Sequence, residues 1–254
     1  MFNMVRAELF RLSRKKSNYV FFLVIAAAYI LLVFLIKMNS LTNGNLYSPH
    51  NMLSIGKQCL TYLPIVFVVQ AFNSVYLDDI TANKFGETLG SGKRSGEYIF
   101  SKLISSIIYI FIGLVFLGLV FFTQFAISSK GFAGDISSYG FVFKNMFYMA
   151  GVVLMGTAVY SLFGMIIALL SRRTTLSLIL IVIFSIQVPT QIFSLLSMKI
   201  KIFKPIAKYT WDNIAFLPLK DLEFSNIFWT GIICYFVIFL VGNILLLNKR
   251  DLKI

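Results

Sequence analysis

Six long apolar stretches without a formal charge constrain the fold of this chain more than any other feature of its sequence. They are rich in Phe, Leu, Ile and Val and cover residues 19–36, 58–77, 103–129, 145–171, 174–198 and 224–248. A helix needs roughly 20 apolar residues to cross a bilayer core about 30 Å thick. None of the stretches shows the two-residue alternation of a membrane β-strand. The sequence therefore predicts an all-α, polytopic membrane protein with six transmembrane helices in one domain, 1–254.

The composition excludes an ordinary soluble domain. Hydrophobic residues make up 58% of the chain and charged residues 13%, whereas soluble chains carry roughly 25% charged residues. The net charge of +13 would indicate nucleic acid binding in a soluble protein. In an apolar chain, surplus cations instead gather in cytoplasmic loops beside anionic headgroups. We therefore predict the lipid bilayer of a cell membrane as the environment, and no nucleic acid partner.

The distribution of basic residues predicts which way the chain crosses the membrane. Six spans place both termini on one side, and that side collects all seven arginines and seven of the lysines, against nine lysines on the other. The positive-inside bias therefore predicts that both termini are cytoplasmic, as in a multi-pass protein of a bacterial-type plasma membrane. The outer connection at 199–220 carries five lysines among aromatic residues. It is typical of a segment at the membrane interface whose lysines reach the headgroups.

Residues 1–18 show the pattern of an amphipathic helix. One side carries apolar residues and the other side basic residues, namely Phe2, Val5, Leu9 and Leu12 against Arg6, Arg11, Arg14 and Lys15. Such a segment is expected to lie flat on the inner leaflet. A short basic flank that only sets the topology is the alternative. A cleaved signal peptide is a further possibility for residues 19–36, but this stretch is long and no small-x-small site follows closely.

The sequence does not favour an enzyme. Each connection between the apolar stretches is shorter than the roughly 50 residues that an independent soluble domain needs. The run Gly90-Ser91-Gly92-Lys93-Arg94 resembles a phosphate-binding loop, but Glu87 takes the place of the first glycine and Arg94 that of the Ser or Thr that holds magnesium. We therefore predict that this chain has no ATPase site and that any energy for transport comes from another polypeptide.

Intramembrane enzymes are excluded on similar grounds. The only histidine, His50, lies in the first outer loop, so the helical His-Glu-x-x-His motif of a metalloprotease is missing. The acids nearest a span are Asp78 and Asp79, at the inner end of the second stretch, and an aspartyl protease would need two carboxylates inside spans. We expect no catalytic residues, no metal ligands and no cofactor bound by this chain.

The segment from Asp78 to Lys102 carries a family resemblance. It resembles the cytoplasmic stretch of type-2 ABC exporter permeases, in which an acidic residue and a Glu-Thr-Leu element precede a loop, an Arg, an apolar patch and a Lys that opens the third span. The matching residues here are Glu87-Thr88-Leu89, Arg94, Ile99-Phe100 and Lys102. The family often has Pro-Val-Ser before the Arg, where this chain has Ser91-Gly92-Lys93. The amphipathic N-terminus and the six-span layout are also similar, so the resemblance covers the whole chain.

The resemblance implies partners and a way of coupling to them. It implies a second permease subunit, identical or related, and two ABC ATPase subunits that bind ATP and Mg beneath the pair. It also implies that the segment 79–101 contains a coupling helix that fits a groove of the ATPase. Charged residues in such a helix can form charge-assisted hydrogen bonds to a soluble partner. The residues implied in this coupling are Asp79, Lys84, Glu87, Thr88, Lys93, Arg94 and Lys102. A solvated loop that only obeys the positive-inside rule is the alternative.

Uncharged polar residues in two spans are candidates for a transport pathway. Gln70 and Asn73 lie one turn apart in the second stretch, and Gln187 and Gln191 lie one turn apart in the fifth, with Pro189 between them. In the family these two spans are expected to line the path between the permeases. The alternative is interhelical hydrogen bonding within one subunit. The small residues Gly164 and Ala168 of the fourth stretch, four positions apart, favour close helix packing.

The spans favour an amphipathic cargo. The chain has 27 phenylalanines, and few polar groups accompany them in the apolar stretches. Small permeases of the family that this chain resembles often export or clear antimicrobial, lantibiotic-type peptides, so the predicted substrate is a membrane-active peptide. A membrane sensor or assembly subunit that binds an ATPase without moving cargo is the alternative function. The absence of a large extracellular segment counts against it.

Overall fold

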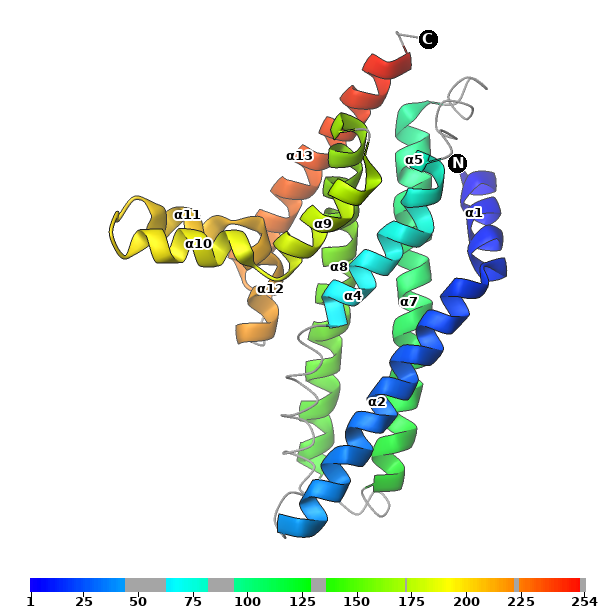
Figure 1. The fold of residues 1–254 in the computed structure, drawn as a ribbon, viewed down its shortest axis with the longest axis vertical. Helices are drawn as coiled ribbons and strands as arrows, with labels where there is room; N and C mark the ends of the chain where they lie inside the picture. Colours follow the sequence, from blue (N-terminus) through cyan, green and yellow to red (C-terminus); the bar gives the residue numbers. More distant parts are fainter. Residues whose placement is uncertain (44–62, 82–93, 129–135, 172, 222–223, 252–254) are drawn as a thin grey trace.

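The computed structural model describes residues 1–43, 63–81, 94–128, 136–171, 173–221 and 224–251 of the chain. Every element in these ranges is a helix (Figure 1), so the predicted all-α class is confirmed for this part of the chain. The helices are α1 Phe2–Arg14, α2 Lys16–Asn43, α4 Leu63–Ala71, the π-helix η1 Phe72–Leu77, α5 Asp78–Thr81, α7 Ser95–Ser128, α8 Ile136–Ser171, α9 Thr174–Ser185, α10 Val188–Ser197, α11 Phe203–Tyr209, α12 Trp211–Asp221 and α13 Asn226–Asp251.

In the part of the chain that the structure describes, three helices are long and apolar enough to cross a bilayer. They are the segments Ser95–Val120 of α7, Met146–Ser171 of α8 and Asn226–Lys249 of α13, and they coincide with the third, fourth and sixth apolar stretches. The chain is therefore a helical membrane protein. The first stretch lies within the single helix α2, and the described part of the second runs from α4 through η1 into α5; residues 58–62 lie outside the described residues. A total of six crossings stays a prediction.

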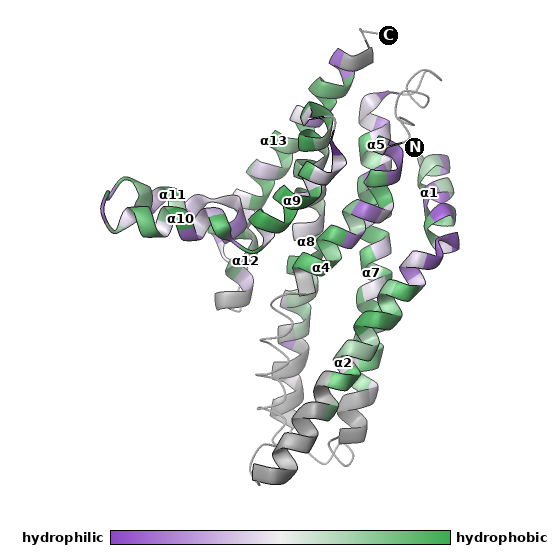
Figure 2. Cartoon of the chain, in the orientation of Figure 1, coloured by the Kyte–Doolittle hydropathy of each residue, from purple (hydrophilic) through white to green (hydrophobic). Residues whose placement is uncertain are grey.

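Helix α8 is the centre of the bundle. Within the most apolar window of each helix, 72% of α8 is buried, compared with 33% of α7 and 17% of α13. Helix α8 packs against α4, α7, α9, α12 and α13. Figure 2 shows α2 and α9 as mainly hydrophobic, while hydrophilic residues gather in α1. The large apolar surface on the outside of the bundle suits acyl chains, since lipid is as apolar as the protein core.

The fifth apolar stretch is not one straight helix. Helices α9 and α10 are bent by 52° at a short break, where Gln187 has the left-handed φ of 60°. Pro189 follows at the start of α10, and a proline there lacks the N–H that would continue the helix from α9. Helix α10 and the next helix, α11, form a hairpin that leaves the bundle sideways (Figure 1). The expected single span at 174–198 is therefore broken near its middle.

The outer connection divides into an exposed and a buried half. Helix α11 contains no buried residue, as expected for an interfacial segment. Helix α12 instead turns back into the protein, and Trp211 at its start is buried. The indole lies against an aromatic cluster made of Tyr160, Phe163, Phe184 and Phe239. The expectation of interfacial aromatics does not hold for Trp211, because packing on α8, α9 and α13 buries this ring.

Gly164 lets three helices approach closely. A Cβ atom at this position would lie 2.4 Å from Ile181 Cδ1 and 2.8 Å from Phe72 Cε2, and both neighbouring side chains are fully buried. Ala168, one turn away, is buried as well. We expect Gly164→Leu to destabilise the fold by about 1–3 kcal/mol through overpacking. Thermal unfolding in detergent should show the loss, whereas Gly118→Leu, which meets only Met146 Cε at 3.9 Å, should leave the midpoint nearly unchanged. Equal midpoints for the two variants would contradict this packing.

Candidate functional site

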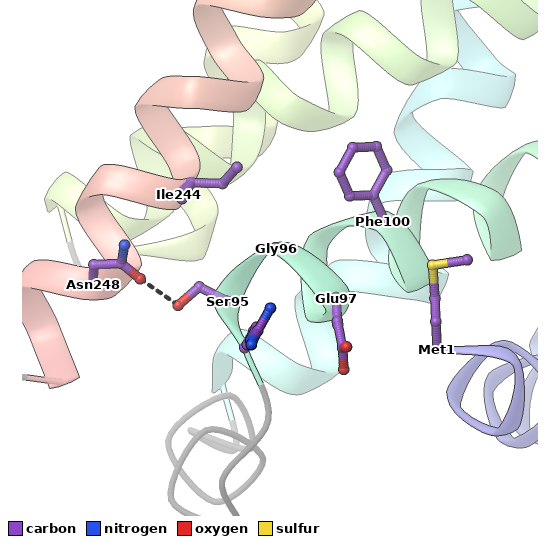
Figure 3. Close-up of a pocket in the computed structure, with 8 residues that line it drawn as sticks. Met1, Ser95, Gly96, Glu97, Phe100, Ile244 and Asn248 are labelled. Carbon is purple, nitrogen blue, oxygen red and sulfur yellow. Dashed lines mark hydrogen bonds between the residues drawn. The ribbon is translucent and has the colours of Figure 1, made fainter.

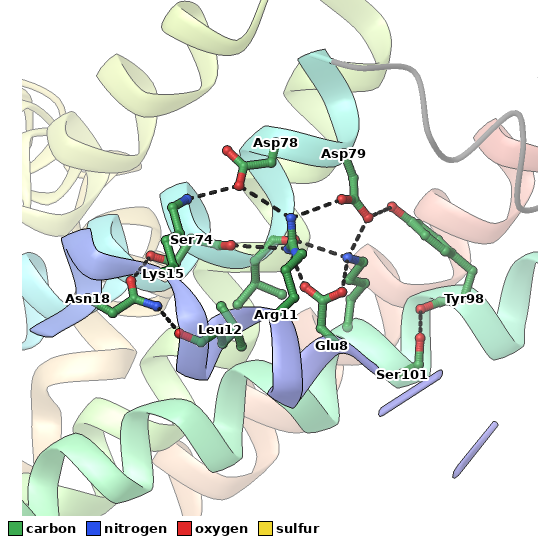
Figure 4. A network of polar contacts seen from close by, with 12 residues as sticks. Glu8, Arg11, Leu12, Lys15, Asn18, Ser74, Asp78, Asp79, Tyr98 and Ser101 are labelled. Atoms are coloured by element: carbon green, nitrogen blue, oxygen red, sulfur yellow. Dashed lines mark hydrogen bonds and ion pairs between the residues drawn. The ribbon is translucent and has the colours of Figure 1, made fainter. Parts of the chain in front are cut away.

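A cluster of ion pairs joins the amphipathic N-terminal helix to the ends of the second and third apolar stretches. Helix α1 lies beside α7 and η1, and Figure 4 shows the side chains that meet between them. We call this group the base cluster. It combines three carboxylates and three cations, which are Glu8, Asp78 and Asp79 with Arg11, Lys15 and Lys102.

Lys102 is the most buried member of the base cluster. Its side chain is 4% exposed, and its Nζ lies 2.8 Å from Glu8 Oε2 and also pairs with Asp79. The same ammonium donates a hydrogen bond of 3.3 Å to the Val75 carbonyl oxygen. Tyr98 donates its hydroxyl to Asp79 Oδ2 at 3.2 Å. The lysine that opens the third stretch therefore fixes α7 both to α1 and to the end of the second stretch.

Arg11 holds the other side of the base cluster. Its Nη1 lies 3.3 Å from Asp78 Oδ2 and 3.3 Å from Asp79 Oδ1, while Nη2 pairs with Glu8. Lys15 Nζ lies 2.9 Å from Asp78 Oδ2. Burial alone lowers the pKa of Arg11, but the carboxylates of Glu8, Asp79 and Asp78 outweigh it and raise this pKa above its ordinary value. The guanidinium therefore stays charged at any physiological pH.

The π-helix η1 supplies backbone acceptors to these cations. A π-helical turn changes the regular i to i+4 pairing, and such turns occur often at functional sites. In η1 the carbonyl oxygens of Ser74 and Val75 each accept a hydrogen bond of 3.2 Å from Arg11 Nη2. Lys102 also donates to the Val75 carbonyl. The irregular helix and the two cations therefore stabilise each other.

A second, uncharged network lies next to the base cluster. Asn18 Oδ1 accepts from Ser74 Oγ at 2.8 Å and from Gln70 Nε2 at 3.2 Å. Asn18 Nδ2 donates to the Leu12 carbonyl oxygen at 2.9 Å, which ties the turn between α1 and α2 to the same site. These bonds extend the junction by one further turn of α4 and η1 toward the membrane.

The structure places only part of the predicted coupling set. Lys84, Glu87, Thr88 and Lys93 lie outside the described residues. Arg94 is exposed directly before α7, whereas Asp79 and Lys102 are buried at 7% and 3% exposure. Asp79 and Lys102 form internal ion pairs, and their role in coupling stays a prediction. Arg11, expected on the outer face of the N-terminal helix, likewise points into the protein.

The predicted pathway residues have separate partners. Gln70 is bonded to Asn18 and Ser74, which is the interhelical role that was the alternative for this residue. Asn73 is half-buried in η1 and Gln191 is exposed on α10. Gln187 donates to the Asp212 carbonyl oxygen at 3.4 Å. A pathway shared by these four residues stays a prediction.

Two carboxylates, one half-buried and one fully buried, have roles that the sequence analysis missed. Glu8 was not singled out, although its spacing of three residues from Arg11 is the spacing of a helical ion pair. Asp212 is fully buried, and its Oδ2 accepts from Thr190 N at 3.1 Å and from Thr190 Oγ1 at 2.7 Å. It thereby caps the first turn of α10 from α12, and no local sequence signal connects residues 22 positions apart.

The chemistry of the base cluster is structural. Its six charges balance in number, and each side chain is held by partners on another helix. In the described part of the chain, no group of three or more His, Cys, Asp and Glu is placed to hold a metal ion. Removing one member of such a cluster leaves an uncompensated buried charge, which is costly. The cluster is therefore a rigid joint of α1, η1 with α5, and α7.

Comparison with known proteins does not assign the chain to a family, because no family model and no curated protein matches it.

Proposed function

We propose that this chain is the transmembrane permease subunit of an ATP-driven exporter of the type-2 ABC class. The base cluster is the observation that carries the proposal. It lies where the segment 79–101 begins at Asp79 and where the same segment continues into α7. A force applied to that segment from the cytoplasm would act on a joint that already links α1, α5 and α7, so these helices would move as one body.

The proposed partners follow from this arrangement. Two ATPase subunits bind ATP and Mg and press against the segment 79–101, and a second permease, identical or related, completes the transport path. The chain itself contributes no catalytic group. The proposed location is a bacterial-type plasma membrane with both termini in the cytoplasm. One part of this arrangement, that both termini lie on the same side, is supported by Met1 and Asn248 of α13, which line the same cleft.

The proposed cargo is an amphipathic or antimicrobial peptide. The exposed residues of the bundle are mainly apolar, and Gln191, exposed on α10 just beyond the break in the fifth stretch, could supply a polar group to a peptide backbone. We expect the double variant Gln187→Leu with Gln191→Leu to reduce peptide efflux severalfold while the complex still assembles. The matched control is Asn226→Leu at the exposed start of α13. Unchanged efflux in the double variant would remove both glutamines from the pathway.

Peptide movement across proteoliposomes tests the function itself. Vesicles that contain this chain and its ATPase subunit should show peptide-stimulated ATP hydrolysis together with movement of labelled peptide across the bilayer. The alternative is a sensor or assembly subunit, which would stimulate hydrolysis without any movement of peptide. Hydrolysis without flux would therefore reject the exporter in favour of the sensor.

A further inference from the structure

A cleft opens at the end of the bundle that carries the base cluster. It has a volume of about 610 Å³ and lies between the start of α1, the start of α7 and the last turns of α13 (Figure 3). Its lining combines apolar side chains with polar and charged ones, which are Met1, Phe100 and Ile244 with Arg94, Ser95, Glu97 and Asn248. We call it the inner cleft.

The walls of the inner cleft are fixed while its lining stays accessible. Ser95 Oγ donates to Asn248 Oδ1 at 2.6 Å, and this bond holds the start of α7 against α13. The Phe100 side chain is 40% exposed, and Arg94 is exposed as well. A Cβ atom added at Gly96 would meet nothing within 4 Å. A hollow that is held in place and half-apolar in this way is better filled by a side chain of a partner protein than by water.

The charge around the inner cleft favours an acidic partner. The acids of this end are held in the base cluster, where Glu8, Asp78 and Asp79 face internal cations. Among the described side chains at this end, two acids reach the surface, since Glu97 is exposed and the Asp78 side chain is 42% exposed. Six cations are exposed, which are Arg6, Arg14, Lys16, Arg94, Arg173 and Lys249. Complementary charge steers association and fixes the orientation of partners.

We infer that the inner cleft is a docking surface for the ATP-binding subunit. The inserted element is a short segment that presents an apolar side chain to Phe100 and Ile244 and a carboxylate to Arg94. The inference rests on the proposed function, in which the ATP-binding subunit contacts the segment 79–101. Arg94 belongs to that segment, and the inner cleft would extend the contact surface from Arg94 to α13. The same ATPase movement would then reach the third and the sixth apolar stretches together.

Two glycines allow a matched crosslinking experiment. Gly96 lies at the inner cleft and Gly140 lies near the start of α8, and among the described residues a Cβ atom would meet nothing within 4 Å at either position. A photoreactive p-benzoylphenylalanine is placed at one or the other in the full complex in native membranes. We expect a crosslink to the ATP-binding subunit from position 96 and none from position 140. Peptide flux is measured on the same membranes.

The outcomes separate this inference from the proposed function. No crosslink from position 96 in membranes with ATP-driven flux would overturn the docking surface and leave the exporter standing, and a crosslink to lipid alone would do the same. Absence of both flux and a bound ATPase would reject both. In a second arm, Gly96→Trp fills the cleft and should lower retention of the ATPase about tenfold, whereas Gly140→Trp should not. Equal retention in folded variants would contradict the inference.

Discussion

Replacing Lys102 with methionine should lower the free energy of unfolding by roughly 3–5 kcal/mol, which is the scale for breaking a buried ion pair. Methionine keeps the length of the side chain but removes the ammonium that faces Glu8 and Asp79. Both carboxylates then lie in a site where they are only 12% and 10% exposed, with less positive charge around them. The Val75 carbonyl oxygen also loses one donor.

Denaturation in mild detergent, followed by circular dichroism, measures this loss. The matched control is Lys249→Met, because Lys249 lies at the same end of the bundle but is exposed; it should change stability by less than about 1 kcal/mol. Adding Asp79→Asn to Lys102→Met should restore part of the loss, since it removes one of the uncompensated charges. A fully stable Lys102→Met variant would show that the base cluster does not hold the helices together.

Reversing the charge of Glu8 should release α1 from the bundle. Glu8→Lys places an ammonium beside Lys102 and Arg11, which at present bind the Glu8 carboxylate. Like charges at this distance repel strongly when they are only partly solvated. We expect Leu12, now 4% exposed, to become accessible. A cysteine at position 12, in a chain whose two cysteines are changed to serine, should react with maleimide at least about tenfold faster in the Glu8→Lys background.

Arg6→Glu is the control for this release. Arg6 lies on α1 and is exposed, so its charge reversal should leave the labelling of position 12 unchanged. Slow labelling in the Glu8→Lys background would mean that apolar packing of Val5 and Leu12 holds α1 without the ion pairs. Loss of peptide-stimulated ATP hydrolysis in Glu8→Lys, but not in Arg6→Glu, would connect the joint to coupling.

The sequence was sufficient to predict the fold class because the apolar stretches that form membrane helices are continuous in the sequence. Apolar stretches of 20 or more residues force helices in a bilayer, and α7, α8 and α13 correspond to predicted stretches. The break at Gln187 was harder to place. Pro189 was visible in the sequence, but a proline can also start a helix or be tolerated within a membrane span. The side chain that caps α10 just beyond the break, Asp212, comes from another helix, so the local sequence does not show it.

The candidate site could be predicted only in part because its geometry is tertiary. Asp79 and Lys102 were singled out for a coupling role, which stays a prediction, and nothing local shows that Lys102 pairs with both Asp79 and Glu8 of α1. Arg11 was placed on the outer face because helical periodicity assigns a side chain to a face and not to a partner. The helical wheel therefore gave the amphipathicity of α1, but not the charges that its polar side would contact.

Reconstitution of the purified chain in proteoliposomes, with and without the proposed ATPase subunit, tests most directly whether a separate protein drives the proposed permease. Labelled peptide and ATP hydrolysis are followed in the same vesicles. We predict that vesicles with the chain alone neither hydrolyse ATP nor move peptide, and that both activities occur once the ATPase subunit and Mg-ATP are present. Peptide flux or catalysis by the chain alone, independent of nucleotide, would contradict the proposed exporter.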